Sequence, residues 1–269
     1  MPEIINHIDE AVFTKIYSDL MSKGVTSSPR GLLIMELLNY QYILPPYVRF
    51  ANFEARKLNV NYIKNEFLWY LKGDRYDDSI TKYAKMWNEV KNPDGSINSN
   101  YGQYIFGREN QFDRVLLELL NDPDSRRASI IILKNEHYNS KSDIPCTYSL
   151  NFKIRDSKLI MTVRMRSQDA VLGLGSDCPI FSFIHEMMLH KLRVAYVDLQ
   201  LGDYVHSADS FHIYERHYEM VKSLLNEPKY SLVVCSLMKD ASEVDFIRKL
   251  DFTSIPEDYL FTKWLTNIV

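Results

Sequence analysis

Cysteine is scarce in this sequence. The 269 residues include three cysteines, Cys146, Cys178 and Cys235. An odd, sparse set without metal-ligand spacing is typical of a protein from a reducing cytosol and argues against a disulfide framework. We therefore expect no structural disulfides, no zinc or iron–sulfur site and no other metal.

Long apolar stretches are also missing. No segment approaches the roughly 18 apolar residues of a membrane span. Residues 1–10 carry acids and a histidine in place of the basic run and apolar core of a signal peptide. We expect a cytoplasmic protein without membrane contacts.

A surplus of positive charge is lacking as well. The formal net charge is -3, whereas proteins that wrap a nucleic-acid polymer usually present a basic face. We expect no nucleic-acid polymer as a partner, so an anionic ligand must be bound by a few local arginines. The chain is 46% hydrophobic and 25% charged, which is an ordinary globular composition. Because no linker, repeat or low-complexity tract stands out, we expect residues 1–269 to form a single domain.

Hydrophobic spacing predicts helices in the first half of the chain. Apolar residues recur every three or four positions over residues 4–22, and this pattern ends at Gly24. Further helices are expected over residues 61–73, 80–90 and 112–120, with an extended segment over 32–44.

From Arg127 onward the pattern becomes that of strands. Residues 129–133 are largely β-branched, and residues 148–165 indicate two strands joined by a turn at 156–157. The rest of the pattern predicts a helix over 180–192, a strand over 195–201 and a helix over 211–225. Because there is no regular βαβ alternation, we expect an α+β domain with one large mixed β-sheet rather than a doubly wound parallel sheet.

Cys146 is a candidate nucleophile. It follows a proline at a loop-to-strand transition, and a lone cysteine is more often a small buried apolar residue than a nucleophile. However, Arg126 and Arg127 lie upstream and Arg166 lies downstream. Such cations lower the pKa of a thiol and bind anions. The alternative for each arginine is an exposed, solvated charge.

Four motifs resemble those of the thymidylate synthase and deoxycytidylate hydroxymethylase family in order and spacing. They are residues 126–127, 145–147, 166–174 and 202–214. The stretches 66–73, 86–89 and 101–102 add to the resemblance, which is weakest before Glu66 and after about Tyr230. The family's long closing segment at the C-terminus has no counterpart in residues 254–269. The resemblance implies one large mixed sheet flanked by helices, packed against the sheet of a second copy in a homodimer.

The resemblance also implies a reaction. In this family a cysteine thiolate adds to carbon 6 of a pyrimidine nucleoside monophosphate, which makes carbon 5 nucleophilic toward the methylene group of the co-substrate 5,10-methylenetetrahydrofolate. Cys146 matches that cysteine. Glu66 matches the acid that holds ordered water and moves protons around the ring, work that suits a partly buried carboxyl group of raised pKa. The alternative for Glu66 is an acid on the helix surface, as its polar neighbours Lys64 and Asn65 would allow.

The same resemblance implies a set of nucleotide-binding residues. A phosphate suits planar, permanently charged donors, and in the family the paired arginines come from the neighbouring subunit. At Arg30 the match is short and displaced, so a solvated loop charge is an equal alternative. Trp87 and Tyr101 are expected to contact the folate, although a tryptophan at helical spacing is otherwise more often a core residue. The resemblance implies that His212 and Tyr214 bind the sugar 3′-hydroxyl. The full nucleotide-binding set is Arg30, Arg126, Arg127, Arg166, Ser167, Asp169, Asp177, His212 and Tyr214.

Three positions depart from thymidylate synthases. Asp177 replaces the asparagine that matches uracil; a carboxyl group accepts from the exocyclic amine of cytosine and, when protonated, donates to ring nitrogen 3. The alternative is that residues 175–177 form a plain turn in which Asp177 caps the next helix. Thr147 and Val90 stand where thymidylate synthases have a histidine and a tryptophan, as in the phage deoxycytidylate hydroxymethylases. Smaller side chains leave room for water at the substrate.

The sequence therefore predicts a hydroxymethylase that uses Cys146, Glu66 and Asp177 as catalytic residues. It would convert dCMP, methylenetetrahydrofolate and water into 5-hydroxymethyl-dCMP and tetrahydrofolate, in the host cytoplasm if the chain is phage-encoded. The alternatives are a methylating relative (a dCMP methylase, or a thymidylate synthase acting on dUMP), a CMP hydroxymethylase and a non-catalytic nucleotide-binding protein.

Overall fold

The computed structural model describes residues 10–140 and 143–267. Its centre is one mixed six-stranded sheet, in the order β1-β2-β6-β5-β4-β3. Neighbouring strands are antiparallel except β5 and β6, which run parallel. This confirms the predicted α+β class with a mixed sheet. The strands are β1 (Val25–Ser27), β2 (Ile34–Leu44), β3 (Ser129–Ile131), β4 (Thr147–Arg155), β5 (Lys158–Asp169) and β6 (Gln200–Tyr214).

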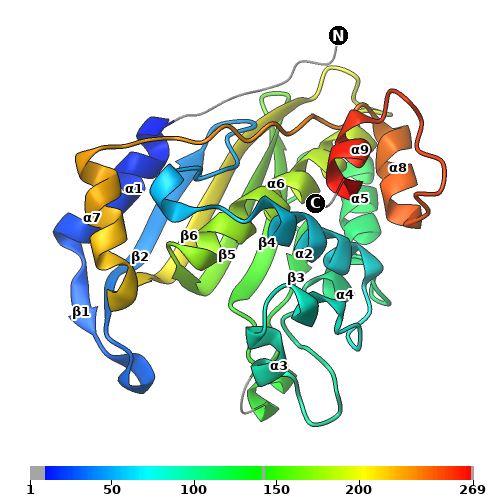
Figure 1. Ribbon diagram of the computed structural model, residues 1–269. Helices are drawn as coiled ribbons and strands as arrows, with labels where there is room; N and C mark the ends of the chain where they lie inside the picture. Colours follow the sequence, from blue (N-terminus) through cyan, green and yellow to red (C-terminus); the bar gives the residue numbers. More distant parts are fainter. Residues whose placement is uncertain (1–9, 141–142, 268–269) are drawn as a thin grey trace.

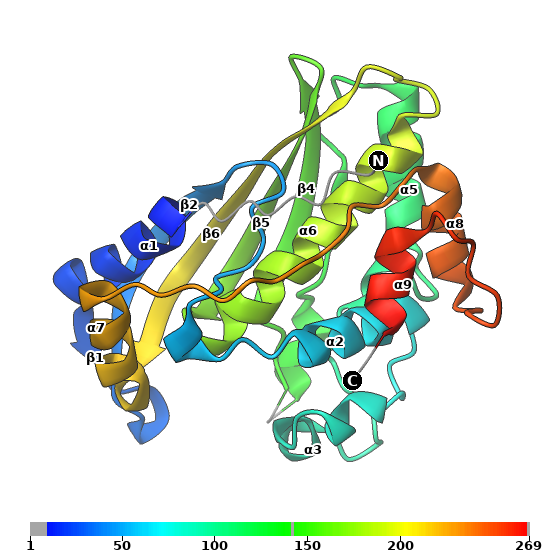
Figure 2. The same ribbon diagram turned by 45° about the horizontal axis from the view of Figure 1, so that its top comes forward.

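The helices gather against one face of this sheet, with α6 along its middle (Figures 1 and 2). Helices α1 and α7 lie near β2, whereas α5, α8 and α9 lie at the opposite side of α6. The helices are α1 (Glu10–Lys23), α2 (Val60–Lys72), α3 (Met86–Val90), α4 (Gly102–Ile105), α5 (Gln111–Asn121), α6 (Leu172–Leu192), α7 (Tyr218–Asn226), α8 (Ala241–Lys249) and α9 (Leu260–Thr266).

Helix α6 is buried nearly all round because it is packed between the sheet and the outer helices α2, α5 and α8. It is apolar on every side, as expected of a helix inside a core. It begins earlier than predicted, at Leu172, because the Asp169 carboxylate accepts the Val171 and Leu172 backbone N–H groups at 2.7 and 3.1 Å. Residues 175–177 are therefore helical, and their interpretation as a plain turn is wrong.

Two other predictions are corrected near the sheet. Residues 195–199 are not a strand, because the Ala195 and Tyr196 N–H groups bond back to the Leu192 carbonyl at the end of α6. Residues 211–214 are not helical but continue β6, whose end pairs with β2 and β5. Pairing with two neighbours overrides the local preference there, and helix α7 starts at Tyr218.

The predicted helix over 80–90 is broken. It consists of a short 3-10 turn, Ser79–Lys82, and the five-residue α3. Just Ile80 and Trp87 are buried in these two pieces, so the segment has no apolar stripe to hold a longer helix against the core. Within the ranges that the structure describes, no helix is both long and apolar enough to cross a membrane.

Candidate active site

Cys146 lies immediately before β4, where backbone contacts hold it in place. Its N–H donates to the Tyr101 hydroxyl at 3.2 Å, and its carbonyl accepts from the Arg166 N–H at 2.8 Å. The Arg166 guanidinium donates to the carbonyls of Pro145 and Ile144 at 3.0 and 2.6 Å. These bonds use backbone atoms, so the cysteine is fixed without occupying its sulfur.

The electrostatic surroundings of Cys146 pull in two directions. Burial raises the pKa of its thiol, and the carboxyl groups of Asp177 and Asp143 add to the rise. Arg166 and, more weakly, Arg30 lower that pKa. Arg30 is exposed, yet its charge reaches the candidate nucleophile. Both arginines favour the thiolate, which is the nucleophilic form.

Glu66 is buried in α2, so the interpretation as a surface acid is wrong. It is 5% exposed. The Tyr62 hydroxyl, one helical turn away, donates to Glu66 Oε1 at 3.1 Å, and the Trp87 indole N–H donates to that hydroxyl at 3.1 Å. Burial raises the pKa of Glu66 to about 8, and Asp177 adds to the rise. The acid is therefore able to hold a proton at neutral pH and to release it.

Asp177 lies in the first half of α6, facing Glu66 and Cys146. Solvent reaches part of the side chain, but protein atoms surround it closely. Burial raises its pKa to about 7; Asp169 adds to the rise, whereas a hydrogen bond from Gln168 opposes it. Gln168 Nε2 donates to Asp177 Oδ2 at 3.3 Å. A carboxyl group with such a pKa is available near neutral pH in both its accepting and its donating form.

Four other predicted nucleotide-binding residues lie at the ends of β5 and β6. The parallel register places Ser167 opposite Ser210 and Asp169 opposite His212. The His212 ring stands edge-on to Tyr214, with 5.2 Å between ring centroids. Since Cys146 precedes β4 beside the same end of β5, these residues share one edge of the sheet with the cysteine.

Arg126 and Arg127 lie elsewhere in the chain. They precede β3 and are exposed, and Arg127 forms a surface ion pair with Glu118 at 3.2 Å. The next residue, Ala128, accepts from the Phe152 N–H, well along β4 from Cys146. The described chain therefore does not bring the arginine pair together with its own Cys146.

Trp87 and Tyr101 are more deeply placed than expected of ligand contacts alone. They are 7% and 6% exposed. Trp87 packs on Trp69 with 5.1 Å between ring centroids, so the core interpretation describes part of its environment. Both residues also contact the candidate catalytic residues: Trp87 through the Tyr62 hydroxyl that bonds to Glu66, and Tyr101 through the Cys146 N–H. Their contact with a folate stays a prediction.

Sequence reasoning missed two residues of this cluster. Tyr62 lies four positions before Glu66, a helical spacing that could have identified it. Gln168 is 1% exposed and bonds to both Asp177 and Tyr42. Nothing in the local sequence signals the contact with Tyr42, because β2 reaches it through the sheet.

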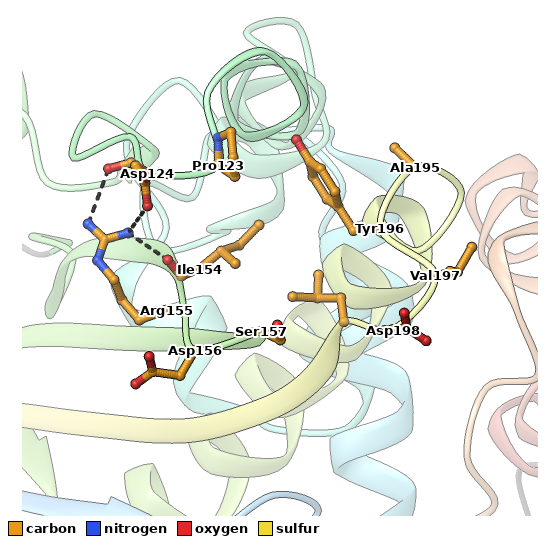
Figure 3. A pocket seen from close by; sticks show the side chains of 11 residues that line it. Pro123, Asp124, Ile154, Arg155, Asp156, Ser157, Ala195, Tyr196, Val197 and Asp198 are labelled. Carbon is orange, nitrogen blue, oxygen red and sulfur yellow. Dashed lines mark hydrogen bonds and ion pairs between the residues drawn. The ribbon is translucent and has the colours of Figure 1, made fainter.

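A separate hollow of about 530 Å³ lies at the turn between β4 and β5. Figure 3 shows Arg155 at its side, turned toward Asp124 and held by that residue's carbonyl at 3.1 Å. The hollow contains none of the predicted site residues and is at the far end of β4 from Cys146. Over residues 10–140 and 143–267, no group of three or more His, Cys, Asp or Glu side chains is arranged to hold a metal ion.

Comparison with known proteins agrees with this arrangement. The sequence profile described as Thymidylate synthase matches residues 12–262. The chain is 32% identical over 225 residues to Deoxycytidylate 5-hydroxymethyltransferase of Enterobacteria phage T2, which covers 80% of this chain and 89% of that protein. The protein of the same name from Enterobacteria phage T4 is 33% identical over 213 residues, covering 75% and 84%.

Thymidylate synthase from Fusobacterium nucleatum is 28% identical over 184 residues, a match that covers 67% of this chain and 65% of that protein. The profile and the phage relatives span most of the sequence, and the profile match includes the cluster of Glu66, Cys146 and Asp177. The chain belongs to the thymidylate synthase family.

Proposed function

We propose that this protein transfers a one-carbon unit to carbon 5 of dCMP and hydrates it, giving 5-hydroxymethyl-dCMP. The reaction consumes dCMP, 5,10-methylenetetrahydrofolate and water and releases tetrahydrofolate. The observation that carries the proposal is the carboxyl group of Asp177, whose pKa of about 7 lies near neutrality. This group faces the candidate nucleophile Cys146 and the candidate proton carrier Glu66.

Cys146 supplies the nucleophile. Its thiolate forms a bond to carbon 6, and the electron pair of the 5,6 double bond moves to carbon 5, which bonds to the one-carbon unit. Loss of the proton on carbon 5 expels tetrahydrofolate and leaves an exocyclic methylene group on that carbon. Water adds to the methylene group, and release of the thiolate from carbon 6 then restores the 5,6 double bond. Arg166 favours the thiolate and holds the backbone beside it.

Asp177 selects cytosine. The protonated carboxyl donates to ring nitrogen 3, and its second oxygen accepts from the exocyclic amine. Uracil reverses both demands, because its nitrogen 3 is a donor and its oxygen 4 an acceptor. A site that leaves buried polar groups unpaired discriminates strongly against the wrong ligand.

Glu66 carries protons and positions water. Its Oε2 is buried without a direct hydrogen bond among the described residues, and this suits a group that binds water next to a substrate. Hydration instead of reduction gives the hydroxymethyl product. The small side chains of Thr147 and Val90, next to Cys146 and at the end of α3, support water access.

The phosphate is bound by residues from two copies of the chain. Arg30, Arg166 and Ser167 act from one copy, and Arg126 and Arg127 act from the other. Two observations support a homodimer with shared sites. The arginine pair is exposed and distant from its own Cys146, and β2 exposes Leu38 and Ile43 at 64% and 48%. Apolar residues on a strand are suited to a sheet-to-sheet contact.

The residues near Glu66 fit a folate co-substrate. When bound, methylenetetrahydrofolate supplies the carbon at the oxidation level of formaldehyde. Trp87 and Tyr101 offer aromatic surfaces beside Glu66 and Cys146, consistent with a flat ring system. Trp87 also donates to the Tyr62 hydroxyl that bonds to Glu66. The indole proposed to contact the folate therefore also keeps the Glu66 carboxyl in position.

Product analysis by mass spectrometry tests the proposal. The protein is incubated with methylenetetrahydrofolate and, in separate reactions, with dCMP, CMP or dUMP. A hydroxymethyl gain on dCMP alone is the expected result, and the same gain on CMP moves the substrate to the ribonucleotide. A methyl gain overturns the hydration step and favours the second candidate, a methylating enzyme. The match to the Fusobacterium nucleatum thymidylate synthase is the observation that favours this candidate. Binding without any product favours a non-catalytic nucleotide-binding protein.

A further inference from the structure

The orientation of the Gln168 side chain is fixed by its two neighbours. The Tyr42 hydroxyl donates to Gln168 Oε1 at 3.0 Å, and Gln168 Nε2 donates to Asp177 Oδ2 at 3.3 Å. An amide oxygen only accepts hydrogen bonds and an amide nitrogen only donates them. Tyr42 therefore determines which end of the buried amide faces Asp177.

A buried polar group behind Tyr42 enforces this direction. The single hydroxyl proton of Tyr42 is used on Gln168, so Cys178, whose sulfur is 3.3 Å from the Tyr42 oxygen, must be the donor in their contact. The His206 ring stacks on Tyr42 with 4.9 Å between centroids and keeps the phenol in place.

Tyr204 and His206 extend this chain of hydrogen bonds with the same direction of donation. Tyr204 Oη and His206 Nδ1 are 2.6 Å apart, and the Tyr204 hydroxyl also reaches Cys178. His206 Nε2 is buried without a hydrogen bond in the described chain. If the ring proton is on Nδ1, the buried Nε2 atom carries an unpaired lone pair and not an unpaired N–H group. We therefore place the proton on Nδ1, so that His206 donates to the Tyr204 hydroxyl. The hydrogen bonds then all run in one direction, from His206 toward Gln168.

We propose that Gln168 is a specificity-determining positioning residue and that Tyr42 sets its orientation. With the amide N–H on Oδ2 of Asp177, the proton of that carboxyl group resides on Oδ1, where nitrogen 3 of cytosine accepts it. Oδ2 keeps a lone pair for the exocyclic amine. A reversed amide would place its oxygen against Asp177 and draw the proton to Oδ2, and Oδ1 would then accept from nitrogen 3 of uracil. This inference rests on the proposed role of Asp177 as the base selector.

The test measures dissociation constants of dCMP and dUMP by calorimetry. All proteins carry Cys146→Ser, so that binding is read without turnover. Tyr42→Phe frees the Gln168 amide to turn over, and we expect the preference for dCMP over dUMP to fall about tenfold, the loss of one buried hydrogen bond. The matched control is Tyr40→Phe. Tyr40 lies on the same strand and donates to Asp19 at 3.0 Å instead, so its loss should leave the preference unchanged.

A second pair of variants separates selectivity from folding. Gln168→Met removes the amide but leaves the buried Tyr42 hydroxyl without an acceptor, which destabilises the fold. Adding Tyr42→Phe removes the orphaned hydroxyl as well. The double variant should regain thermal stability over Gln168→Met while its preference for dCMP stays low. Recovery of both properties together would mean that Gln168 acts on the fold alone, and would overturn the proposal.

Asp177→Asn in the same Cys146→Ser background distinguishes the selector role of Asp177 from the positioning role of Gln168. If it shifts preference toward dUMP while Tyr42→Phe and Gln168→Met keep the parent's preference, the positioning role of Gln168 is wrong and the selector role of Asp177 stands. If Asp177→Asn itself leaves the preference unchanged, Asp177 is not the selector and both ideas fail. A shift in all three variants, with Tyr40→Phe unchanged, supports the proposal.

Discussion

Helix α6 carries two acids in contrasting environments. Asp177 forms no ion pair with any of the described residues, and burial raises its pKa to about 7. Glu186, further along the helix, accepts from the Arg49 guanidinium and from the Met238 N–H. Burial also opposes the charge on Glu186, but Arg49 and His190 together outweigh it and hold the pKa of that carboxyl below its usual value. A paired acid is a fixed charge of the core, whereas an unpaired acid in a similar position exchanges protons.

The largest effect on folding is expected from breaking the paired acid. Glu186→Gln leaves the Arg49 guanidinium buried without its counter-charge, and the Nε and Nη1 of Arg49 already lack hydrogen bonds to the described residues. We expect a loss of about 3 to 5 kcal/mol in the free energy of unfolding, measured with denaturant. Arg49→Met combined with Glu186→Met removes both charges and should recover most of that loss. A fully stable Glu186→Gln protein would mean that the fold does not depend on the charge of Glu186, and Glu186 would then not differ from Asp177 in this respect.

The unpaired acid should respond in the opposite way. Asp177→Asn leaves no buried charge uncompensated, so the free energy of unfolding should change by less than about 1 kcal/mol. The relative kcat/KM for dCMP against dUMP should fall by roughly tenfold to a hundredfold, because the amide suits the donor and acceptor pattern of uracil. Steady-state kinetics with both nucleotides measure this ratio. A large loss of stability with an unchanged ratio would assign Asp177 a structural role like that of Glu186.

The two kinds of acid also give stability opposite dependences on pH. The folded-state pKa values of Glu66 and Asp177 are about 8 and 7, above their ordinary 4.5 and 3.8. The folded chain therefore holds more protons in this window, and the stability from these two groups falls as pH rises through 7 to 8. Glu186, with its lowered pKa, contributes stability that is lost as pH falls.

Thermal unfolding across this pH range measures the difference. Glu66→Gln cannot titrate, so its melting temperature should fall less steeply than that of the parent between about pH 5 and 8. The matched control is Glu118→Gln, which changes a more accessible carboxyl group outside the cluster. Equal slopes in the parent and in Glu66→Gln would mean that Glu66 does not retain its proton in the folded chain.

The smallest effect on folding is expected at an exposed charge. Arg126→Glu should change the free energy of unfolding by no more than about 0.5 kcal/mol, yet it should weaken phosphate binding and lower turnover. Mixing this variant with Cys146→Ser under subunit exchange should restore part of the activity, because one site of the mixed dimer has both the cysteine and an intact arginine pair. Activity that stays absent after exchange would count against shared sites.

The sequence allowed prediction of the features that depend on local pattern. The strand pair on either side of Asp156 and Ser157, the helix that carries Glu66 and the mixed sheet were all predicted. Periodicity reports these elements because one face of each is buried. Residues 211–214 were predicted wrongly because their conformation is set by pairing with β2 and β5, and a local window contains neither partner.

The candidate site likewise has features that the sequence indicates and features that depend on the tertiary structure. Cys146 and Glu66 stand in motifs that resemble the family, Asp177 follows one of these motifs, and the structure brings the three residues together. The contact between Tyr42 and Gln168 depends instead on the order of strands in the sheet and on a side-chain angle. The raised pKa values depend on burial, which residue identity alone does not fix.

The sheet also determines when the site can exist. β2 pairs with β6 so that Ile34 lies opposite Tyr214, and β5 and β6 are parallel neighbours joined through α6. Contacts between such distant parts of a chain form slowly, because a long loop must close before any bond is gained. A ribosome that has already released Cys146 has not yet released His212 or Tyr214, so the newly made chain presents the proposed nucleophile before the residues proposed to bind the nucleotide sugar. Assembly of the candidate site is therefore expected to be a late event of folding.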